Sequence, residues 1–176
     1  MKRKTLHPML SLLMLLCGPA AAEDRSTVTF NGRVDEVTCS IDSGDQDQTV
    51  RLPVISDKAL LVSGTTAGAT PFRINVRCPL SARQVRAYFE NSTYTDPDTG
   101  NLKLQNEDGK SSAGNVQVRL LRVDGTPIAV GNRLSMPVFP VNAGAAKLEY
   151  QAVYYATGEA TAGQVYTTAT YALEMP

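Results

Sequence analysis

Apolar and polar residues alternate along much of this chain, and a period of two predicts β-strands that bury one face. The pattern is clear in STVTFNGRVDEVTCSI, residues 26–41, where polar residues separate Val28, Phe30 and Val34. Gly32 takes one place in this apolar series, where a strand normally has a side chain to pack. The predicted strand therefore has an apolar face with one missing side chain, close to the N-terminus.

Further segments have the composition and spacing of strands. They span residues 48–56, 70–78, 83–91, 101–105, 115–123, 133–141, 146–156 and 164–175. Turn-forming sequences separate them, among them Asp96-Pro97-Asp98 and Asp124-Gly125. Only residues 56–64 suggest a helix, as a single turn. Short strands at this spacing, with no internal repeat or linker, predict an all-β sandwich.

The first residues are typical of a secretory signal peptide. A basic start, Lys2-Arg3-Lys4, precedes the apolar run MLSLLMLL and a small-residue cleavage site at Ala20-Ala21-Ala22. This apolar run is too short to span a membrane, and no second run in the sequence is long enough. We therefore expect residues 1–22 to be removed and the mature chain to be exported, with no membrane insertion.

Charge and histidine content narrow the function. The chain has 17 basic and 17 acidic residues, and the signal peptide holds only basic ones, so the mature chain is slightly acidic. No basic patch suggests nucleic acid or anionic lipid as a partner. The one histidine, His7, is lost with the signal peptide, which excludes Ser-His-Asp and Cys-His catalysis and imidazole metal sites. The sequence therefore predicts no enzyme activity, no metal and no cofactor.

The mature chain retains two cysteines, Cys39 and Cys78. In an exported protein an even pair predicts a disulfide. In the chain-entropy model, closing a loop of this length stabilises a fold by roughly 4 kcal/mol. A metal site on two cysteines alone, without a nearby histidine, is the less favoured alternative.

Both ends of the mature chain resemble the subunits of chaperone–usher fimbriae, the pilins. In VTFNGRVDEVTCSI, Gly32 stands seven residues before Cys39, as in that family. In the closing stretch LEYQAVYYATGEATAGQVYTTATYALEMP, Gly163 is fourteenth from the C-terminus. The alternating run that follows consists of Ala169, Tyr171, Leu173 and Met175. The internal stretch AGNVQVRLLRVDGTPI also matches, so the resemblance covers essentially the whole mature chain.

The resemblance implies an incomplete immunoglobulin-like β-sandwich that lacks its last strand and keeps a groove open along its core. An N-terminal donor strand from one subunit would fill the groove of the next, as in the β-strand addition of pilins. The implied donor residues are Val28, Phe30, Gly32 and Val34, with Gly32 where the groove is too shallow for a side chain. The implied groove and chaperone-binding strand contains Gly163, Tyr171, Leu173 and Met175. Met175 departs from the family, which commonly has tyrosine in that position.

The resemblance also implies domain limits and partners. Residues 1–22 would be the signal peptide, 23–36 the donor-strand extension and 37–176 the pilin domain. The partners would be other pilin subunits, a periplasmic chaperone and an outer-membrane usher. The subunit would pass through the periplasm to the cell surface and polymerise into a fimbria that supports adhesion.

Two alternatives remain open at this point. Residues 26–34 alone also fit the first strand of a self-contained sandwich. The chain would then be a monomeric exported module that binds a glycan or a protein. A minor adaptor or tip pilin is the alternative within the fibre class. Concentration-dependent assembly distinguishes a fibre subunit from a binding module, which stays monomeric.

Overall fold

The longest strands form where apolar and polar residues alternate most regularly. The computed structural model describes residues 29, 31, 38–106 and 111–176. Its long strands are β2 (Thr66–Arg77), β3 (Gln84–Phe89), β5 (Gly114–Arg122) and β8 (Ala145–Thr161). In β3 every second residue is buried, namely Val85, Ala87 and Phe89. The strand thus has one face on the core and one toward solvent.

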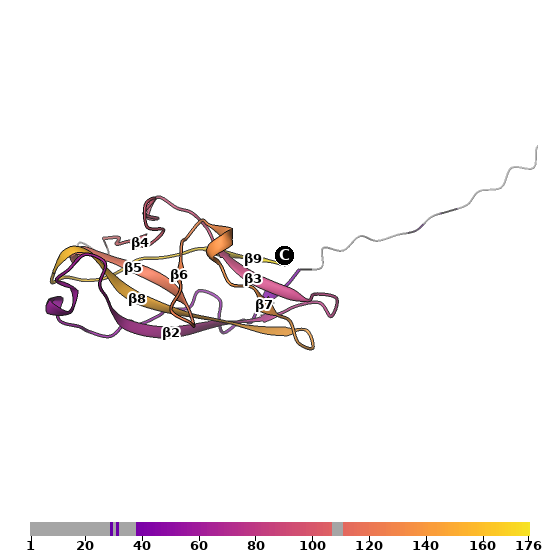
Figure 1. Cartoon of the computed structure of the whole chain (residues 1–176). Coiled ribbons are helices and arrows are strands. Elements are labelled where there is room, and N and C mark those ends of the chain that lie inside the picture. Colours follow the sequence, from indigo (N-terminus) through magenta and orange to yellow (C-terminus); the bar gives the residue numbers. More distant parts are fainter. Residues whose placement is uncertain (1–28, 30, 32–37, 107–110) are drawn as a thin grey trace, which may run out of the picture. The chain divides into compact units, whose positions relative to one another are not determined.

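The strands form two sheets, and every pairing between named strands is antiparallel. The larger sheet has the order β1-β2-β8-β5-β4, with β6 also paired to β5. The smaller sheet has the order β7-β3-β9. Its last strand, β9, closes the chain and lies beside β3 (Figure 1). The short strands are β1 (Ser40–Ile41), β4 (Leu102–Lys103), β6 (Pro127–Ile128), β7 (Phe139–Pro140) and β9 (Tyr171–Glu174).

Aromatic rings fill the centre of the core between the sheets. Tyr150 of β8 stacks on Phe72 with ring centroids 5.4 Å apart, and meets Phe89 and Phe139 edge-on at 5.3 and 5.6 Å. A second cluster surrounds Tyr154 further along β8. These rings join β2, β3, β7 and β8 and so hold the two sheets together.

The predicted disulfide is confirmed. Cys39 and Cys78 are bonded, with their Cα atoms 4.1 Å apart, just below the usual range of about 4.4–6.8 Å. Cys39 directly precedes β1 and Cys78 directly follows β2. Because β1 and β2 are paired, the bond joins the ends of two neighbouring strands.

The predicted helical turn at 56–64 is confirmed as η1 (Asp57–Leu60), a 3-10 helix that the Ser56 hydroxyl caps. The strand predicted for 133–141 is wrong over most of its length. Asn132 caps a second 3-10 helix, η2 (Arg133–Ser135), and only Phe139–Pro140 pairs as a strand. Prolines at 137 and 140 lack the N–H that a strand ladder needs.

The strand predicted for 48–56 is also wrong, in an informative way. Residues 48–55 are extended but belong to no ladder within the part of the chain that the structure describes. The predicted donor-strand extension, 23–36, lies almost wholly outside the described residues, so the proposed domain limits stay predictions.

Candidate functional site

The last segment of the chain, residues 164–174, is hydrogen-bonded along one edge. The amide of Gln164 donates to Ser111 O (2.9 Å), and Tyr166 O accepts from the amide of Gln105 (2.8 Å). Thr170 O accepts from the amide of Glu90 (2.8 Å), and the ladder between β9 and β3 follows. This edge is therefore fixed along its whole length to three other parts of the sandwich.

The opposite edge of the same segment pairs with no residue that the structure describes. In an antiparallel ladder, the backbone groups of alternate residues point to opposite neighbours. Since Thr170 bonds to the β3 side, the N–H and C=O groups of Tyr171 and Leu173 point away from β3. Val165, Thr167 and Ala169 likewise make no backbone hydrogen bond to any described residue. We call these outward-pointing backbone groups of 165, 167, 169, 171 and 173 the open edge.

Ala169 is exposed, whereas the other four side chains on the open edge are half-buried. Val165, Tyr171 and Leu173 are half-buried and pack against the main core, and the Tyr171 ring lies 5.8 Å from that of Phe89. A strand with a paired neighbour on each side would have such apolar residues covered. The half-burial of these apolar residues is consistent with the lack of a described strand on this side.

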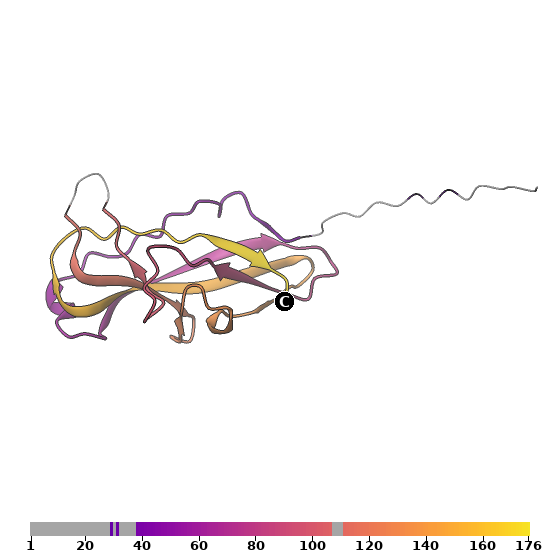
Figure 2. The same cartoon turned by 90° about the horizontal axis from the view of Figure 1, so that it is seen from above.

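A second segment with unpaired backbone, residues 48–55, runs along the same side of the sandwich (Figure 2). Its backbone N–H groups make no hydrogen bond to any described residue. The side chains of Val50, Leu52 and Ile55 are half-buried. Two contacts hold it in place. The Gln48 amide group donates to Arg73 O (3.1 Å), and the Tyr154 hydroxyl donates to Pro53 O (3.0 Å).

The open edge and residues 48–55 pack against the same hydrophobic core. Leu52 from one and Val165 from the other pack against both hydrophobic clusters. Near the other end, burial raises the pKa of Tyr171, and the carboxylates of Asp45 and Asp47 raise it further. The open edge and residues 48–55 thus flank one strip of incompletely covered core.

The structure brings together part of the predicted site. Tyr171 and Leu173 share the inward face of β9, whereas Met175 is 43% exposed and lies just beyond the end of the strand. Gly163 lies against the backbone of Ser112 and Ala113, where no Cβ would fit. The donor residues Val28, Phe30, Gly32 and Val34 lie outside the described residues. The roles predicted for all these residues therefore stay predictions.

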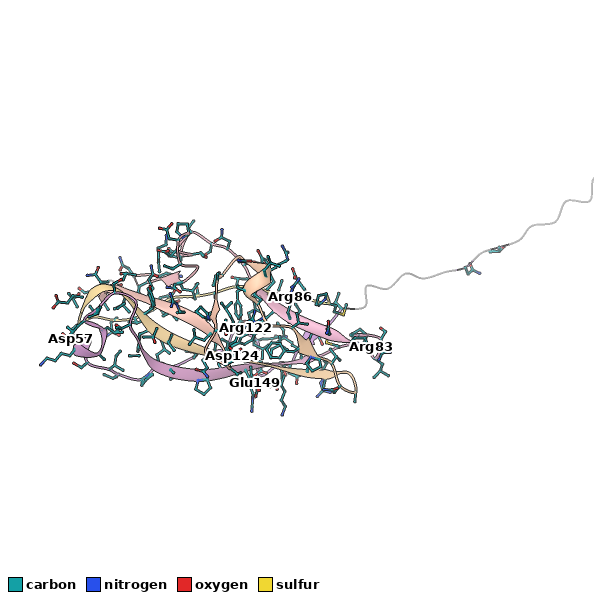
Figure 3. All side chains as sticks on the ribbon, viewed as in Figure 1. Asp57, Arg83, Arg86, Arg122, Asp124 and Glu149 are labelled. Carbon is teal, nitrogen blue, oxygen red and sulfur yellow. A yellow bond between two sulfur atoms is a disulfide. The ribbon has the colours of Figure 1, made fainter. Side chains whose placement is uncertain are left out.

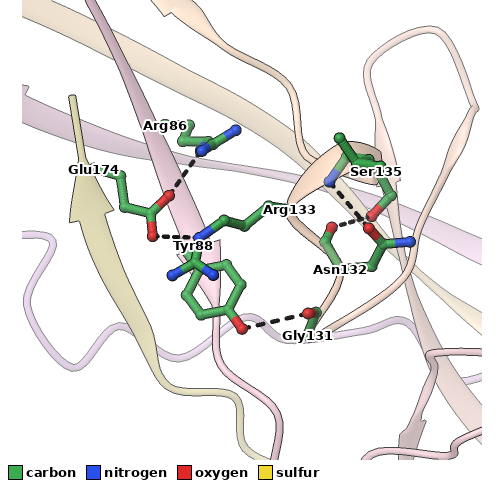
Figure 4. Close-up of polar contacts among 8 residues, drawn as sticks. Arg86, Tyr88, Gly131, Asn132, Arg133, Ser135 and Glu174 are labelled. Carbon is green, nitrogen blue, oxygen red and sulfur yellow. Dashed lines mark hydrogen bonds and ion pairs between the residues drawn. The ribbon is translucent and has the colours of Figure 1, made fainter. Parts of the chain in front are cut away.

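Sequence reasoning missed an ion-pair cluster on the outer side of β9. One carboxylate oxygen of Glu174 accepts from Arg86 Nε of β3 and the other from Arg133 Nε of η2, both at 2.8 Å (Figure 4). The Arg133 guanidinium also stacks on the Tyr88 ring, 4.1 Å from its centroid. Burial raises the pKa of Glu174, but the hydrogen bonds from Arg133 and Arg86 outweigh it and leave this pKa below its ordinary value. Sequence separations of 88 and 41 residues hide these contacts from any local pattern.

Other polar clusters offer less to a ligand. Arg122, Asp124 and Glu149 are near one another (Figure 3) and line a shallow depression of ≈ 380 Å³. The Arg122 guanidinium is already engaged there, since it donates twice to Ser135 O. Among the described residues, no three His, Cys, Asp or Glu side chains gather as a metal site would require. In the same part of the chain, no helix has the length and apolar character needed to cross a membrane.

Comparison with known proteins gives consistent results. The family model for "Fimbrial protein" matches residues 28–175. F17 fimbrial protein of Escherichia coli is 37% identical over 94% of this chain and 95% of its own length. The major fimbrial subunit SMF-1 of Stenotrophomonas maltophilia is 38% identical over 91% of this chain and 98% of its own length.

A solved structure shares the fold. In a structure of a chaperone–usher pilus that reveals the basis of rod uncoiling, one chain matches with a TM-score of 0.61. The match covers 90% of this chain and all of the other at 17% sequence identity. At this identity the match establishes the immunoglobulin-like fold, which confirms the predicted fold class.

Proposed function

Since this chain belongs to the fimbrial protein family of chaperone–usher pilus subunits, we propose that it polymerises by donor-strand complementation. Residues 23–36 of one subunit enter the strip between the open edge and residues 48–55 of the next. The single observation that carries the proposal is this strip, where two segments with unpaired backbones flank half-buried apolar side chains. The proposal makes the protein a structural subunit, with no catalytic role.

Physical chemistry favours such an insertion. An inserted strand can hydrogen-bond to the open edge and to residues 48–55, because both present free backbone groups. Each new hydrogen bond contributes about 0.5–1.5 kcal/mol net. Val28, Phe30 and Val34 would cover the exposed strip, and full burial of such a side chain contributes about 1.5–3 kcal/mol. Gly32 would lie where the core rises too close for a side chain.

The same strip explains the need for a chaperone. An unpaired strand edge is a template for uncontrolled pairing, which soluble proteins normally block. We infer that a periplasmic chaperone lends a strand to the open edge, and that an outer-membrane usher exchanges it for the next subunit's donor. The assembled fimbria then reaches the cell surface, where it supports adhesion.

A synthetic peptide of residues 23–37 tests the proposal. The chain beginning at residue 23 is refolded with its disulfide intact and kept dilute, and its thermal stability is measured with and without peptide. We expect the peptide to raise the melting temperature, because a ligand that binds only the folded state stabilises it. A peptide with Phe30→Asp serves as the control and should have no effect. Equal melting temperatures with both peptides would contradict the proposal and favour a self-contained sandwich.

A further inference from the structure

β9 has features that should make it fray. It has four residues, and among the described residues β3 is the one strand that pairs with it. A short strand held by few backbone hydrogen bonds on a single edge opens more easily than the centre of a sheet. Yet strand addition needs the open edge presented in one register, because a shift of one residue would turn Tyr171 and Leu173 away from the core.

Glu174 is the last residue of β9, where a side-chain contact best restrains the end of the strand. It is paired with Arg86 in the ladder between β9 and β3, so this ion pair closes the last rung of the ladder. Arg133 approaches the same carboxylate from a different element, the turn η2. Two charge-assisted hydrogen bonds to one carboxylate are stronger than neutral ones and fix its geometry.

The turn that supplies Arg133 is itself firmly held. The Asn132 side chain accepts from the amide of Leu134 (3.0 Å), and Ser135 O accepts two bonds from Arg122. The Tyr88 hydroxyl donates to Gly131 O (3.3 Å) while its ring carries the Arg133 guanidinium. Three elements, β9, β3 and η2, are therefore joined through Glu174 without help from any donor strand (Figure 4).

We propose that Glu174 is a positioning residue for strand acceptance, which holds β9 on β3 in the single register that an incoming strand can pair with. This inference rests on the proposed donor-strand function and names residues that prepare its acceptor side. Glu174 points to the outer side of β9, so it acts through the strand and need not touch the donor. Once a donor strand is inserted, the new ladder holds β9 by itself.

The proposal predicts an asymmetric effect on binding kinetics. If only a fraction of molecules have β9 in place, the apparent affinity falls by that fraction. Glu174→Gln leaves two guanidiniums without their shared carboxylate, so β9 should be in place less often. The association rate of the donor peptide should fall roughly three- to tenfold, and the dissociation rate should stay within about twofold. A general loss of packing would instead speed dissociation.

The experiment measures both rates by stopped-flow fluorescence with a labelled peptide of residues 23–37 and the refolded chain from residue 23. Glu90→Gln is the matched control. Glu90 is exposed and lies just beyond the end of the β3–β9 ladder that is opposite Glu174. Its side chain forms no ion pair with a described residue. Its two rates should equal those of the unaltered chain. If Glu174→Gln folds poorly, Arg133→Gln on the exposed turn serves as a second variant. It should likewise slow association of the peptide without changing the dissociation rate.

The outcomes distinguish the positioning role of Glu174 from the donor-strand function. Slower association with unchanged dissociation, in Glu174→Gln or Arg133→Gln but not in Glu90→Gln, supports the positioning role. Normal association by both variants overturns that role and leaves the donor-strand function intact. Failure of the unaltered chain to bind the peptide overturns the donor-strand function and the positioning role with it. Hydrogen exchange of the Ala172 amide reports directly on the pairing of β9. Without peptide, it should be faster in Glu174→Gln than in the unaltered chain. With peptide bound, the two exchange rates should be equal.

Discussion

Gly163 lies directly against the backbone of Ala113. A Cβ on Gly163 would overlap the amide nitrogen of Ala113 and lie 2.7 Å from its Cα, and 2.5 Å from the carbonyl carbon of Ser112. All three are backbone atoms, which cannot turn aside as a side chain can. The contact fixes the start of the segment that carries the open edge, so Gly163 acts through close packing.

Gly163→Ala should therefore destabilise the subunit. Overpacking of this kind typically costs about 1–3 kcal/mol, because the backbones must separate to admit the methyl group. Urea unfolding of the purified chain measures the change. Gly44→Ala is the control, since nothing lies within 4 Å of a Cβ at Gly44. A free energy of unfolding for Gly163→Ala equal to that of Gly44→Ala would refute the close-packing role.

Tyr150 and Tyr154 form a matched pair with opposite expectations. Tyr150 is 1% exposed, and its hydroxyl lies near the backbone N–H of Ala87 but makes no well-formed hydrogen bond in the described part of the chain. The Tyr154 hydroxyl donates to Pro53 O. Tyr150→Phe should leave stability unchanged or raise it by up to about 1 kcal/mol, whereas Tyr154→Phe should cost about 0.5–1.5 kcal/mol. Thermal unfolding of both variants measures these changes. A clear loss of stability in Tyr150→Phe would show that the Tyr150 hydroxyl has a hydrogen-bond partner.

The Glu174 cluster should make stability depend on pH in the acid range. The pKa of Glu174 is below its ordinary value of 4.5 in the folded chain. The unfolded chain therefore takes up the proton first, and the cluster's contribution is present above about pH 4.5 and lost as the pH falls through the lower folded pKa. The charged groups that contact the carboxylate are the guanidiniums of Arg86 and Arg133, each at 2.8 Å.

The free energies of unfolding of the unaltered chain and Glu174→Gln should accordingly differ at pH 7 and converge as the pH falls through the lowered pKa of Glu174 in the folded chain. The measurement is the difference in free energy of unfolding between the two chains at each pH. A difference that persists unchanged at low pH would mean that the carboxylate charge is not what holds β9.

Leu173 and Ala172 test which face of β9 binds the chaperone. Leu173 is half-buried on the inward face, and Ala172 is exposed on the outward face of the same strand. Leu173→Asp should abolish a chaperone complex, because a carboxylate buried without a partner costs several kcal/mol. Ala172→Asp should preserve the complex. Co-purification from the periplasm measures both, and recovery of the Leu173→Asp complex at normal yield would mean that β9 is ordinary core.

Sequence reasoning predicted the parts of the fold that local patterns determine. The strands around 70–78, 83–91, 115–123 and 146–156 follow from alternation, and the cysteine pair predicted the disulfide. It failed where structure depends on a distant or missing partner. Residues 48–55 have a strand pattern but no described neighbour to pair with, which the donor-strand proposal explains.

The candidate site divides in the same way. Alternation at the chain end predicted that Tyr171 and Leu173 share a face. Nothing local predicted Glu174, which alternation alone places among the solvent-facing residues. Its partners come from β3 and from η2, a turn that the sequence had suggested was strand. Contacts between elements far apart in sequence are set by the tertiary fold, so no periodicity reveals them.

Gly32→Leu tests the central claim most directly, because the donor-strand account and the self-contained sandwich predict opposite damage. Donor-strand exchange is measured with the variant as donor and, separately, as acceptor, beside the thermal stability of the chaperone-bound subunit. A leucine at this position must enter a shallow part of the neighbour's groove. Overpacking there should weaken donor-strand binding by about 1–3 kcal/mol. The account predicts a normally stable, disulfide-bonded subunit that accepts a donor strand at the usual rate but donates its own slowly or not at all. A destabilised subunit with unchanged exchange in both roles would contradict it.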